Sequence, residues 1–386
     1  MAKTVDHRFI EETLISLIRV NSENPPGNNK EIVDYLAELA KREGLRFERQ
    51  SVTKEMENIV IFPSWQISPE RIITLIGHTD TVPIGNLENW TKDPFGEDRD
   101  GDIIFGRGAA DMKGGLAAAL AVVKCINQLD EPPQITPVFI GTADEEVLMR
   151  GADKILAHKR LQNTPEFAVI GEPTGLDMGI AGKGCLHIKL HIKGVAAHGS
   201  RPELGINAID TCYDIIRKIR KNMPSLTDDL LGSPTVNLAA LHGGTAFIVP
   251  DSCEAELDFR FPSPLNCTAF ENIVREACET VEKPSRASCE IVRCYPPVHT
   301  SDHHPLIKAV GKELEVIGKK SKFCGLSYCT DGSILIPKWK TPFLLFGPGN
   351  PNALHVADEW VSISETIMAA QVLSKAILAT YSKRVD

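Results

Sequence analysis

The chain has 386 residues, of which 42% are hydrophobic and 24% are charged, and its net charge at pH 7 is −9. This composition is typical of globular proteins, and the length predicts two domains. The acidic charge and the lack of a basic run argue against nucleic acid as a partner. No apolar run approaches the roughly 20 residues of a membrane span, and no apolar stretch follows the first residues as in a secretory signal, so we expect a cytoplasmic protein.

Ten cysteines are scattered along the chain without a CxxC pair, and five of them lie between Cys253 and Cys294. In a long chain without a signal sequence, this pattern is typical of reduced thiols, most of them packed in the core. A secreted protein held together by disulfides is the alternative.

The first part of the chain alternates predicted helices and strands. The apolar residues of a first helix repeat at helical spacing: Ile10, Leu14, Leu17 and Ile18. Asp6 is available as its cap, and a second helix at residues 29–42 ends before Gly44. Apolar runs then predict four strands, at residues 58–62, 72–76, 135–140 and 167–170. An Ala- and Leu-rich stretch at 113–129 predicts a buried helix, so we expect a largely parallel sheet covered on both faces.

The middle of the chain predicts a second, smaller domain. Its expected elements are a strand at residues 185–193, a helix at 205–220, strands at 235–241 and 253–261, a helix at 268–281 and a strand at 288–293. The order βαββαβ is that of a ferredoxin-like α+β sandwich. We therefore place residues 184–295 as a domain inserted into an α/β domain made of residues 1–183 and 296–386.

Polar side chains that bind metal or move protons come directly after three of the predicted strands. His78 follows residues 72–76, Glu145 and Glu146 follow 135–140, and Glu172 follows 167–170. In an open α/β sheet the carboxyl ends of the strands form the ligand crevice, so this shared placement is a stronger signal than any one motif.

Each motif also has an ordinary explanation. His78 and Asp80 are two residues apart, so in an extended segment their side chains face the same side. The carboxylate of Asp80 can then accept a hydrogen bond from the second ring N–H of His78 and orient the ring for metal binding. The alternative is a His–Asp pair at the surface. Asp111 lies among glycines and can bridge two cations, or it merely caps the helix that follows. One of Glu145 and Glu146 can bind a metal ion while the other reaches the reacting water; alternatively, the two form a solvated acidic turn.

Five further residues are ambiguous in the sequence. Glu172 precedes a proline in a loop, and His355 lies in a loop dense in Gly, Pro and Asn, where a histidine is often structural. The acids Asp358 and Glu359 that follow it could stand at a helix start. His198 could donate a hydrogen bond to a developing oxyanion, or it orients a loop.

Taken together, these segments resemble one family, the two-zinc aminoacylases, deacetylases and peptidases that include acetylornithine deacetylase and succinyl-diaminopimelate desuccinylase. The resemblance spans residues 7–379 and implies that the inserted domain is a lid or dimerisation domain. The consecutive arginines that precede this domain in the desuccinylase are absent, because this chain has AGKG there, and no feature singles out ornithine.

The resemblance implies a metal-binding role for five residues. The first metal ion would be held by His78 and Glu172, the second by Glu146 and His355, and Asp111 would bridge them. A cis peptide bond is implied between Asp111 and Met112. The implied ions are Zn²⁺, with Co²⁺ or Mn²⁺ as alternatives.

The resemblance also implies the remaining site residues. Glu145 matches the general base and Asp80 the partner of the first metal-binding histidine. His198 matches a histidine of the inserted domain that assists catalysis, often across a dimer interface. Substrate contacts are implied at four positions: Asn237, Arg260, Gly325 and Asn352.

We therefore expect a homodimeric, metal-dependent amidohydrolase that cleaves the amide bond of an N-acyl amino acid, of deacetylase or desuccinylase type, with a metal-activated water. The substrate is then a small molecule, and no membrane is expected as a partner. One alternative is a dipeptidase or carboxypeptidase with the same dinuclear centre. The other is a catalytically inactive metal-binding homologue, against which the intact pair Glu145–Glu146 argues.

Overall fold

The structure is a computed structural model, and it describes residues 4–65, 71–161, 164–320 and 322–382. The chain folds into two compact units. Unit 1 comprises Met1–Ile180, Thr300–Cys324 and Thr330–Asp386, and unit 2 comprises Ala181–His299 and Gly325–Cys329.

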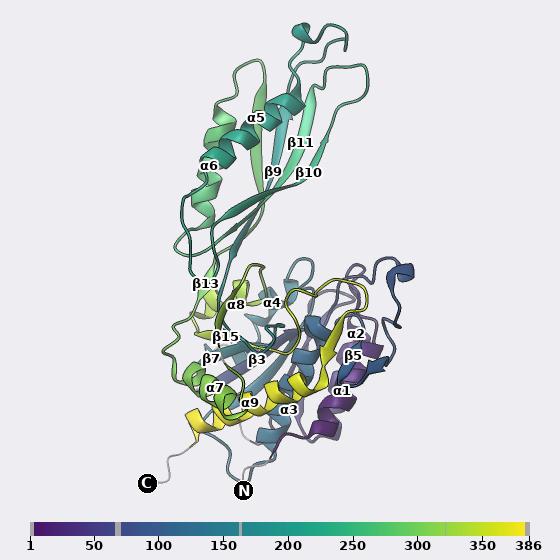
Figure 1. The fold of residues 1–386 in the computed structure, drawn as a ribbon, viewed down its shortest axis with the longest axis vertical. Coiled ribbons are helices and arrows are strands. Elements are labelled where there is room, and N and C mark those ends of the chain that lie inside the picture. The colour runs from purple at the N-terminus through teal and green to yellow at the C-terminus, as the bar shows by residue number, and fades with distance from the viewer. Residues whose placement is uncertain (1–3, 66–70, 162–163, 321, 383–386) are drawn as a thin grey trace. The chain divides into compact units, whose positions relative to one another are not determined.

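Unit 1 is built on a central sheet whose strands run in the order β1-β2-β6-β3-β7-β15-β8 (Figure 1). These strands are β1 (Arg46–Ser51), β2 (Glu57–Phe62), β3 (Ile72–His78), β6 (Thr136–Thr142), β7 (Phe167–Ile170), β8 (Met178–Gly182) and β15 (Phe343–Leu345). β3 pairs in parallel with β6 and β7, and β15 pairs in parallel with β7, whereas β1, β2 and β8 pair antiparallel. Every residue of β3, β6 and β7 is buried, so both faces of the sheet are covered. The predicted largely parallel sheet is confirmed.

Helices cover this sheet (Figure 1). They are α1 (His7–Arg19), α2 (Lys30–Arg42), α3 (Gly114–Asn127), α4 (Arg150–Ile155), α7 (Pro305–Val316), α8 (Gly332–Trp339) and α9 (Ile363–Tyr381). The predicted buried helix α3 packs on β3 and β6 and against α1 and α9, and α7 packs on α9. α2 packs on β1 and β2, and α4 on β2 and β6. A small sheet with the order β16-β5-β4 completes the unit: β4 (Arg99–Asp100), β5 (Ile103–Phe105) and β16 (Trp360–Ser362).

Local signals in the sequence set the ends of the first helices. The predicted cap Asp6 accepts a hydrogen bond from the amide of Phe9 at 3.1 Å, which satisfies one of the open amides of α1. α2 ends before Gly44, whose φ of 66° is the left-handed conformation that glycine adopts readily.

Unit 2 is a four-stranded antiparallel sheet in the order β10-β11-β9-β12 with two helices. Its elements are β9 (Gly184–Lys193), α5 (Ala208–Lys221), β10 (Thr235–Gly243), β11 (Ser252–Phe261), α6 (Cys267–Glu279) and β12 (Arg286–Tyr295). The predicted ferredoxin-like order is confirmed. β13 (Val298–His299) pairs with the last residues of β8, and β14 (Phe323–Leu326) follows later in the chain.

The two faces of this sheet differ in chemistry. α5 and α6 pack on one face over an apolar core that includes Leu186, Ile188, Leu257 and Phe259. The alternate residues of β9 and β11 point away from that core, and cross-strand pairing places acids opposite basic residues. This polar face of unit 2 consists of His187, Lys189, His191, Glu254, Glu256 and Asp258.

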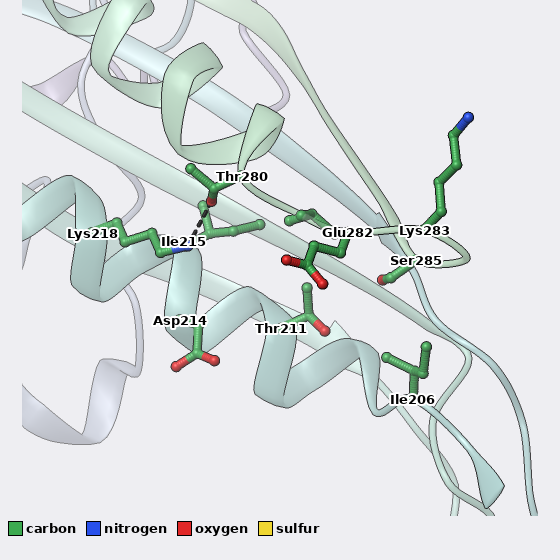
Figure 2. Close-up of a pocket in the computed structure, with 10 residues that line it drawn as sticks. Ile206, Thr211, Asp214, Ile215, Lys218, Thr280, Glu282, Lys283 and Ser285 are labelled. Atoms are coloured by element: carbon green, nitrogen blue, oxygen red, sulfur yellow. Dashed lines mark hydrogen bonds between the residues drawn. The ribbon is translucent and has the colours of Figure 1, made fainter.

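A cavity of about 300 Å³ lies beside α5 in unit 2 (Figure 2). Lys218 on α5 donates a hydrogen bond to the hydroxyl of Thr280 at 2.6 Å across it. Charges of both signs line the cavity, with Asp214 and Glu282 beside the lysines, so it lacks the excess of one charge that would favour an ionic ligand.

The prediction that all ten cysteines are reduced is wrong for two of them. Cys267 and Cys294 form a disulfide, with their Cα atoms 6.2 Å apart. The packing of α6 on β12 brings the two together across 27 residues of sequence, which no local spacing pattern reveals. Within the described residues, no helix is both long and apolar enough to cross a membrane.

Candidate metal centre

Two histidines and one aspartate form the middle of a cluster in unit 1, in which His78 and Asp111 are buried and His355 is half exposed. His78 is the last residue of β3, and its Nε2 lies 3.1 Å from Oδ1 of Asp111. Nε2 of His355 lies 3.2 Å from the other carboxylate oxygen, Oδ2. Asp111 therefore presents one oxygen to each histidine, which is the placement expected of a carboxylate that bridges two cations.

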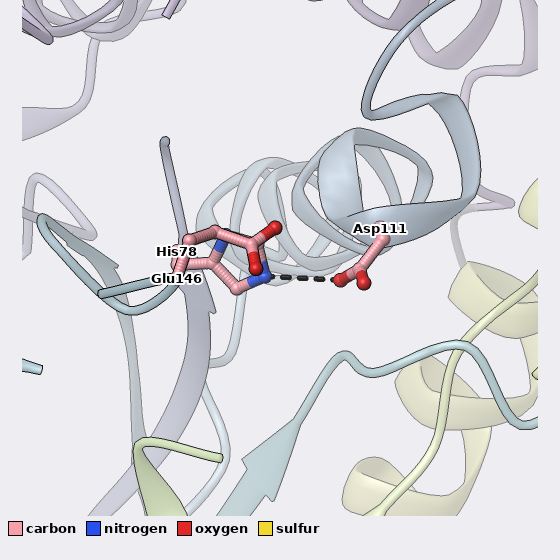
Figure 3. A group of neighbouring side chains, drawn as sticks. All are labelled: His78, Asp111 and Glu146. Carbon is pink, nitrogen blue, oxygen red and sulfur yellow. Dashed lines mark hydrogen bonds and ion pairs between the residues drawn. The ribbon is translucent and has the colours of Figure 1, made fainter. Parts of the chain in front are cut away.

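Glu146 joins this cluster from the turn after β6. Its Oε2 lies 3.3 Å from Nε2 of His355. The ligand atoms of His78, Asp111 and Glu146 all lie within 4.8 Å of one another, and the three side chains point toward a common point in Figure 3. The described residues contain no second group of this kind, and Glu172 is outside it, although the resemblance pairs Glu172 with His78.

Glu145 and Glu172 lie close enough to the cluster to interact with it electrostatically. Burial raises the pKa of Glu145 well above its usual range; the charge of His78 opposes this, and the carboxylates of Glu172 and Glu146 reinforce it. Burial also raises the pKa of Glu172, and the charge of Asp111 adds to that effect. The site thus crowds four acids into a poorly solvated space.

The histidines respond to this negative charge. Hydrogen bonds with Asp111 and Glu146 raise the pKa of His355 to about 10. Burial opposes protonation of His78, but the hydrogen bond to Asp111 and the neighbouring carboxylates outweigh it and raise its pKa well above the usual value. The raised pKa values of His78 and His355 both result from the excess of negative charge in the site.

The backbone around Asp111 and Glu172 is unusually close-packed. A Cβ atom on Gly115 would lie 2.0 Å from the carbonyl oxygen of Gly171, and a Cβ on Gly347 would lie 2.7 Å from that of Glu172. Only glycine permits these approaches. The peptide bond between Asp111 and Met112 is cis, as the resemblance implied. The side chain of Asp111 contacts the histidines, and α3 begins without a side-chain cap, so the helix-cap explanation is wrong.

The predicted hydrogen bond between the carboxylate of Asp80 and His78 is wrong. Nδ1 of His78 lies 2.8 Å from the backbone carbonyl of Asp80, while the nearest carboxylate oxygen is 3.9 Å away. The strand ends at His78, so the extended geometry assumed for the pair does not reach Asp80. The carboxylate instead accepts hydrogen bonds from the amides of Glu145 at 3.1 Å and Glu146 at 3.3 Å. Asp80 therefore orients the His78 ring through its backbone and the acidic turn through its side chain.

Glu359 is a residue of this region that the sequence did not reveal. Its buried carboxylate accepts hydrogen bonds from the amides of Gly108, Ala110 and Asp111, and it pairs with Arg107 at 2.6 Å. The expectation that it stands at a helix start is wrong, because Ser362 caps α9. Glu359 fixes the backbone that carries Asp111.

Asn24 is a second such residue. Its side-chain amide donates to Oδ2 of Asp80 and to Oδ1 of Asp144, each at 2.9 Å. Asp144 adopts a positive φ of 68° directly before Glu145. The SENPPGNN loop that contains Asn24 carried no signal beyond its turn-forming composition.

The remaining predicted site residues lie elsewhere in the chain. Asn352 is exposed in unit 1, and its amide donates to the side chain of Asn350 at 2.9 Å. Four others belong to unit 2: His198, Asn237, Arg260 and Gly325. Asn237 is exposed on β10, Arg260 pairs with Asp258 at 3.0 Å, and a Cβ on Gly325 would lie 2.5 Å from Leu231.

His198 is exposed and faces a hollow of about 320 Å³ that it shares with Phe247 and Ile248. The amide of Ser200 donates to Nδ1 of His198 at 3.1 Å. A neutral imidazole that accepts at Nδ1 carries its proton on Nε2. His198 therefore presents an N–H donor at the far end of its ring.

Residues 74–379 match the model of Peptidase family M20/M25/M40. The chain belongs to this family. It is therefore a hydrolase, as the sequence resemblance indicated. Acetylornithine deacetylase of Photorhabdus laumondii is 30% identical over 364 residues, which are 91% of this chain and 90% of that protein. Acetylornithine deacetylase of Vibrio parahaemolyticus is 29% identical over 96% of this chain and 98% of its own length.

Several solved structures of similar fold are peptidases. A metallo-carboxypeptidase of family M20 from Sulfolobus solfataricus has a TM-score of 0.80 at 18% identity and covers 96% of this chain and 99% of its own. A tripeptidase from Staphylococcus aureus has a TM-score of 0.78 at 22% identity over 98% of this chain and 99% of its own. At these identities the likeness concerns the fold alone.

Proposed function

We propose that this chain hydrolyses the amide bond of N-acyl amino acids with two divalent metal ions. The preferred ion is Zn²⁺, and Co²⁺ and Mn²⁺ are the alternatives. The observation that carries this proposal is the bridging placement of Asp111, with a histidine on each carboxylate oxygen. His78 and Glu172 would hold one ion, Glu146 and His355 the other, and Asp111 both.

The donor set suits divalent cations. Four carboxylates share a buried space with two histidines, so the site carries more negative charge than its own residues can neutralise. Oε1 of Glu146 is buried and has no hydrogen-bond partner among the described residues. A cation would satisfy that oxygen and the charge together. Imidazole and carboxylate ligands are those that Zn²⁺, Co²⁺ and Mn²⁺ accept.

In this proposal the protein's own residues position the reactants and move one proton. Bound ions supply a water of lowered pKa and polarise the substrate carbonyl. The carboxylate of Glu145 takes a proton from the attacking water and returns it to the nitrogen of the leaving amine. Asp80 holds the Glu145–Glu146 turn through the two amides that it accepts.

We assign to His198 the hydrogen bond that stabilises the oxyanion, because its Nε2 carries a proton and its side chain is exposed. We further propose that residues 184–295 form a lid/dimerisation domain inserted into a catalytic domain of residues 1–183 and 296–386. In the resulting homodimer His198 would act in the partner's site. We assign the substrate contacts to Asn237, Arg260, Gly325 and Asn352. We also propose that the protein is located in the cytoplasm.

An N-acyl amino acid is favoured over a peptide because the relatives at about 30% identity are named acetylornithine deacetylase. The peptidases among the similar structures keep a dipeptidase or carboxypeptidase as the second candidate. An inactive metal-binding homologue is the third.

A hydrolysis assay separates these candidates. Purified protein is depleted of metal with a chelator, restored with Zn²⁺, Co²⁺ or Mn²⁺, and given N-acetyl derivatives of basic, acidic and apolar amino acids and dipeptides made from the same amino acids. We expect metal-dependent release of acetate at a higher kcat/KM than any dipeptide shows. Faster dipeptide cleavage would establish the second candidate, and metal binding without turnover would establish the third.

Mixed dimers test the assignment of His198. His198→Ala and Glu145→Ala subunits, each inactive alone, are combined under conditions that exchange subunits. If His198 acts in the partner's site, each mixed dimer has one site that lacks both groups and one that is complete. Activity then returns to about half of the wild-type value per mixed dimer by two-fold symmetry. No recovery despite measured exchange contradicts action across the interface.

A further inference from the structure

Unit 2 concentrates the cysteines of the chain. Eight of the ten belong to it, and only Cys125 and Cys324 belong to unit 1. The eight are arranged in pairs: one is the disulfide Cys267–Cys294, and three are neighbouring thiols that affect each other's pKa, namely Cys185 with Cys329, Cys212 with Cys253 and Cys278 with Cys289. Neighbouring thiols are the starting point for disulfide formation.

The pair Cys185–Cys329 differs from the others in its surroundings. Cys185 is buried on β9, and its thiol donates to Oδ1 of Asp258 at 3.6 Å. Cys329 is partly exposed; as a thiol it donates to the carbonyl of Lys183 at 3.6 Å, and its sulfur accepts from Nη1 of Arg260 at 3.6 Å. A guanidinium next to a partly exposed sulfur stabilises the thiolate, the form that reacts with oxidants.

The pair Cys212–Cys253 lacks this combination. Cys212 and Cys253 are both enclosed in the apolar core between α5 and the sheet. Burial raises the pKa of Cys212 to about 12, so its thiol stays protonated. Burial also raises the pKa of Cys278 to about 12, and it raises the pKa of its partly exposed neighbour Cys289, where the charge of Arg275 opposes the shift. The enclosed pair Cys212–Cys253 is suited to packing, and it is the matched control for Cys185–Cys329.

We propose that Cys185 and Cys329 form a redox-active dithiol, in which hydroperoxides oxidise Cys329 and Cys185 then closes a disulfide. The proposal does not depend on the substrate of the enzyme. The neighbouring Cys329 and burial raise the pKa of Cys185, which keeps Cys185 protonated as the second thiol to react.

The chemistry balances with a hydroperoxide as the only co-reactant. The Cys329 thiolate attacks one peroxide oxygen, an S–O bond forms, the O–O bond breaks, and the leaving oxygen is protonated to water or alcohol. The sulfur of Cys185 then attacks the sulfenic sulfur of Cys329. An S–S bond forms, the S–O bond breaks, and the thiol proton of Cys185 leaves with the hydroxyl group as water. Two thiols are oxidised, and one peroxide is reduced.

The test maps disulfides in the full-length folded protein. The protein is reduced, freed of reductant, treated with hydrogen peroxide in small excess, alkylated with iodoacetamide, and digested for mass spectrometry. We expect a cross-linked peptide pair that contains Cys185 and Cys329, with loss of both alkylated peptides, while Cys212 and Cys253 become alkylated after denaturation. Absence of the Cys185–Cys329 cross-link, or equal oxidation of Cys212–Cys253, overturns the proposal.

Single substitutions test the order of reaction. In Cys185→Ser, we expect a sulfenic acid at Cys329 that dimedone captures, and in Cys329→Ser we expect no capture at Cys185. Capture at Cys185 in that variant would reverse the assignment. Far-UV circular dichroism and the melting temperature establish whether both variants fold. The disulfide mapping uses the wild-type protein, so it tests the proposal even if a variant does not fold.

Discussion

The metal centre of unit 1 and the polar face of unit 2 use the same residue types in opposite ways. In both regions a histidine nitrogen lies about 3 Å from a carboxylate: 3.1 Å for His78 and Asp111, and 3.2 Å for His191 and Glu254. The side chains of His78 and Asp111 are 1% and 9% exposed, whereas those of His191 and Glu254 are 37% and 54% exposed.

The charge balance of the two regions differs as well. On the polar face, Glu256 pairs with both His187 and Lys189, so its charge is matched within the protein. In unit 1, four acids surround two histidines, and one carboxylate oxygen of Glu146 is buried without a partner among the described residues. A His–carboxylate contact therefore indicates a metal site when it is buried and has an excess of negative charge, and the contact distance alone does not.

The largest effect is expected from Glu145→Ala. Removal of a general base lowers the rate by about 10²–10⁴-fold, and loss of water positioning adds to this. We expect kcat/KM to fall by at least that factor while bound metal, measured by elemental analysis, stays at the wild-type level. Glu145→Gln, which keeps the shape and removes the base, should fall as far. Activity within tenfold of wild type in either variant would refute the role of Glu145.

Asp111→Ala should empty both metal positions, because one carboxylate serves both histidines. Elemental analysis of the purified protein should give two divalent ions per chain for the wild type and a large loss of both for the variant. Glu254→Ala is the matched control on the polar face, and it should retain two ions. A wild-type protein that saturates with one ion would contradict the dinuclear assignment.

Glu359→Ala should destabilise unit 1 by leaving Arg107 buried and unpaired. Removal of one partner of a buried ion pair costs about 3–5 kcal/mol of unfolding free energy. Urea denaturation should therefore show a lower midpoint, and metal affinity should fall because the Asp111 loop loses three amide contacts. Glu359→Gln keeps a hydrogen-bond acceptor and should lose less. Equal stability of all three proteins would show that Glu359 does not hold the loop.

The smallest effect is expected from Glu256→Ala on the polar face. The side chains of His187, Lys189 and Glu256 are about one-third exposed, and partly solvated ion pairs contribute up to about 1 kcal/mol. We expect a change in unfolding free energy within that limit, with unchanged kcat/KM and metal content. A loss of bound metal in this variant would abolish the distinction between the two regions.

The sequence predicted the fold well because its signals are local. Apolar runs defined β3, β6 and β7, and the alternation of apolar residues in β9 defined the sheet of unit 2. Residues at or shortly after strand ends, such as His78 and Glu146, were found for the same reason. A parallel sheet brings such ends to one edge, so position after a strand is itself spatial information.

What the sequence missed depends on contacts across long separations. Glu359 lies 248 residues from Asp111, whose amide it binds, and its own neighbourhood resembled an ordinary helix start. The expected Asp80–His78 bond failed because the strand ends at His78, two residues before Asp80, and the extended geometry does not continue to Asp80. The Cys267–Cys294 disulfide depends on the packing of α6 on β12, which spacing between cysteines does not encode.

The route of the chain through unit 2 limits how this protein can be recombined. Unit 2 takes most of its residues from Ala181–His299 but also includes the five-residue stretch Gly325–Cys329. That stretch packs within unit 2, with Gly325 against Leu231 and the thiol of Cys329 bonded to the carbonyl of Lys183 at 3.6 Å. A chimaera that exchanged only the long segment with a relative would pair a foreign surface with this native strip. Successful domain grafting, in the laboratory or in evolution, requires both segments to be inherited together.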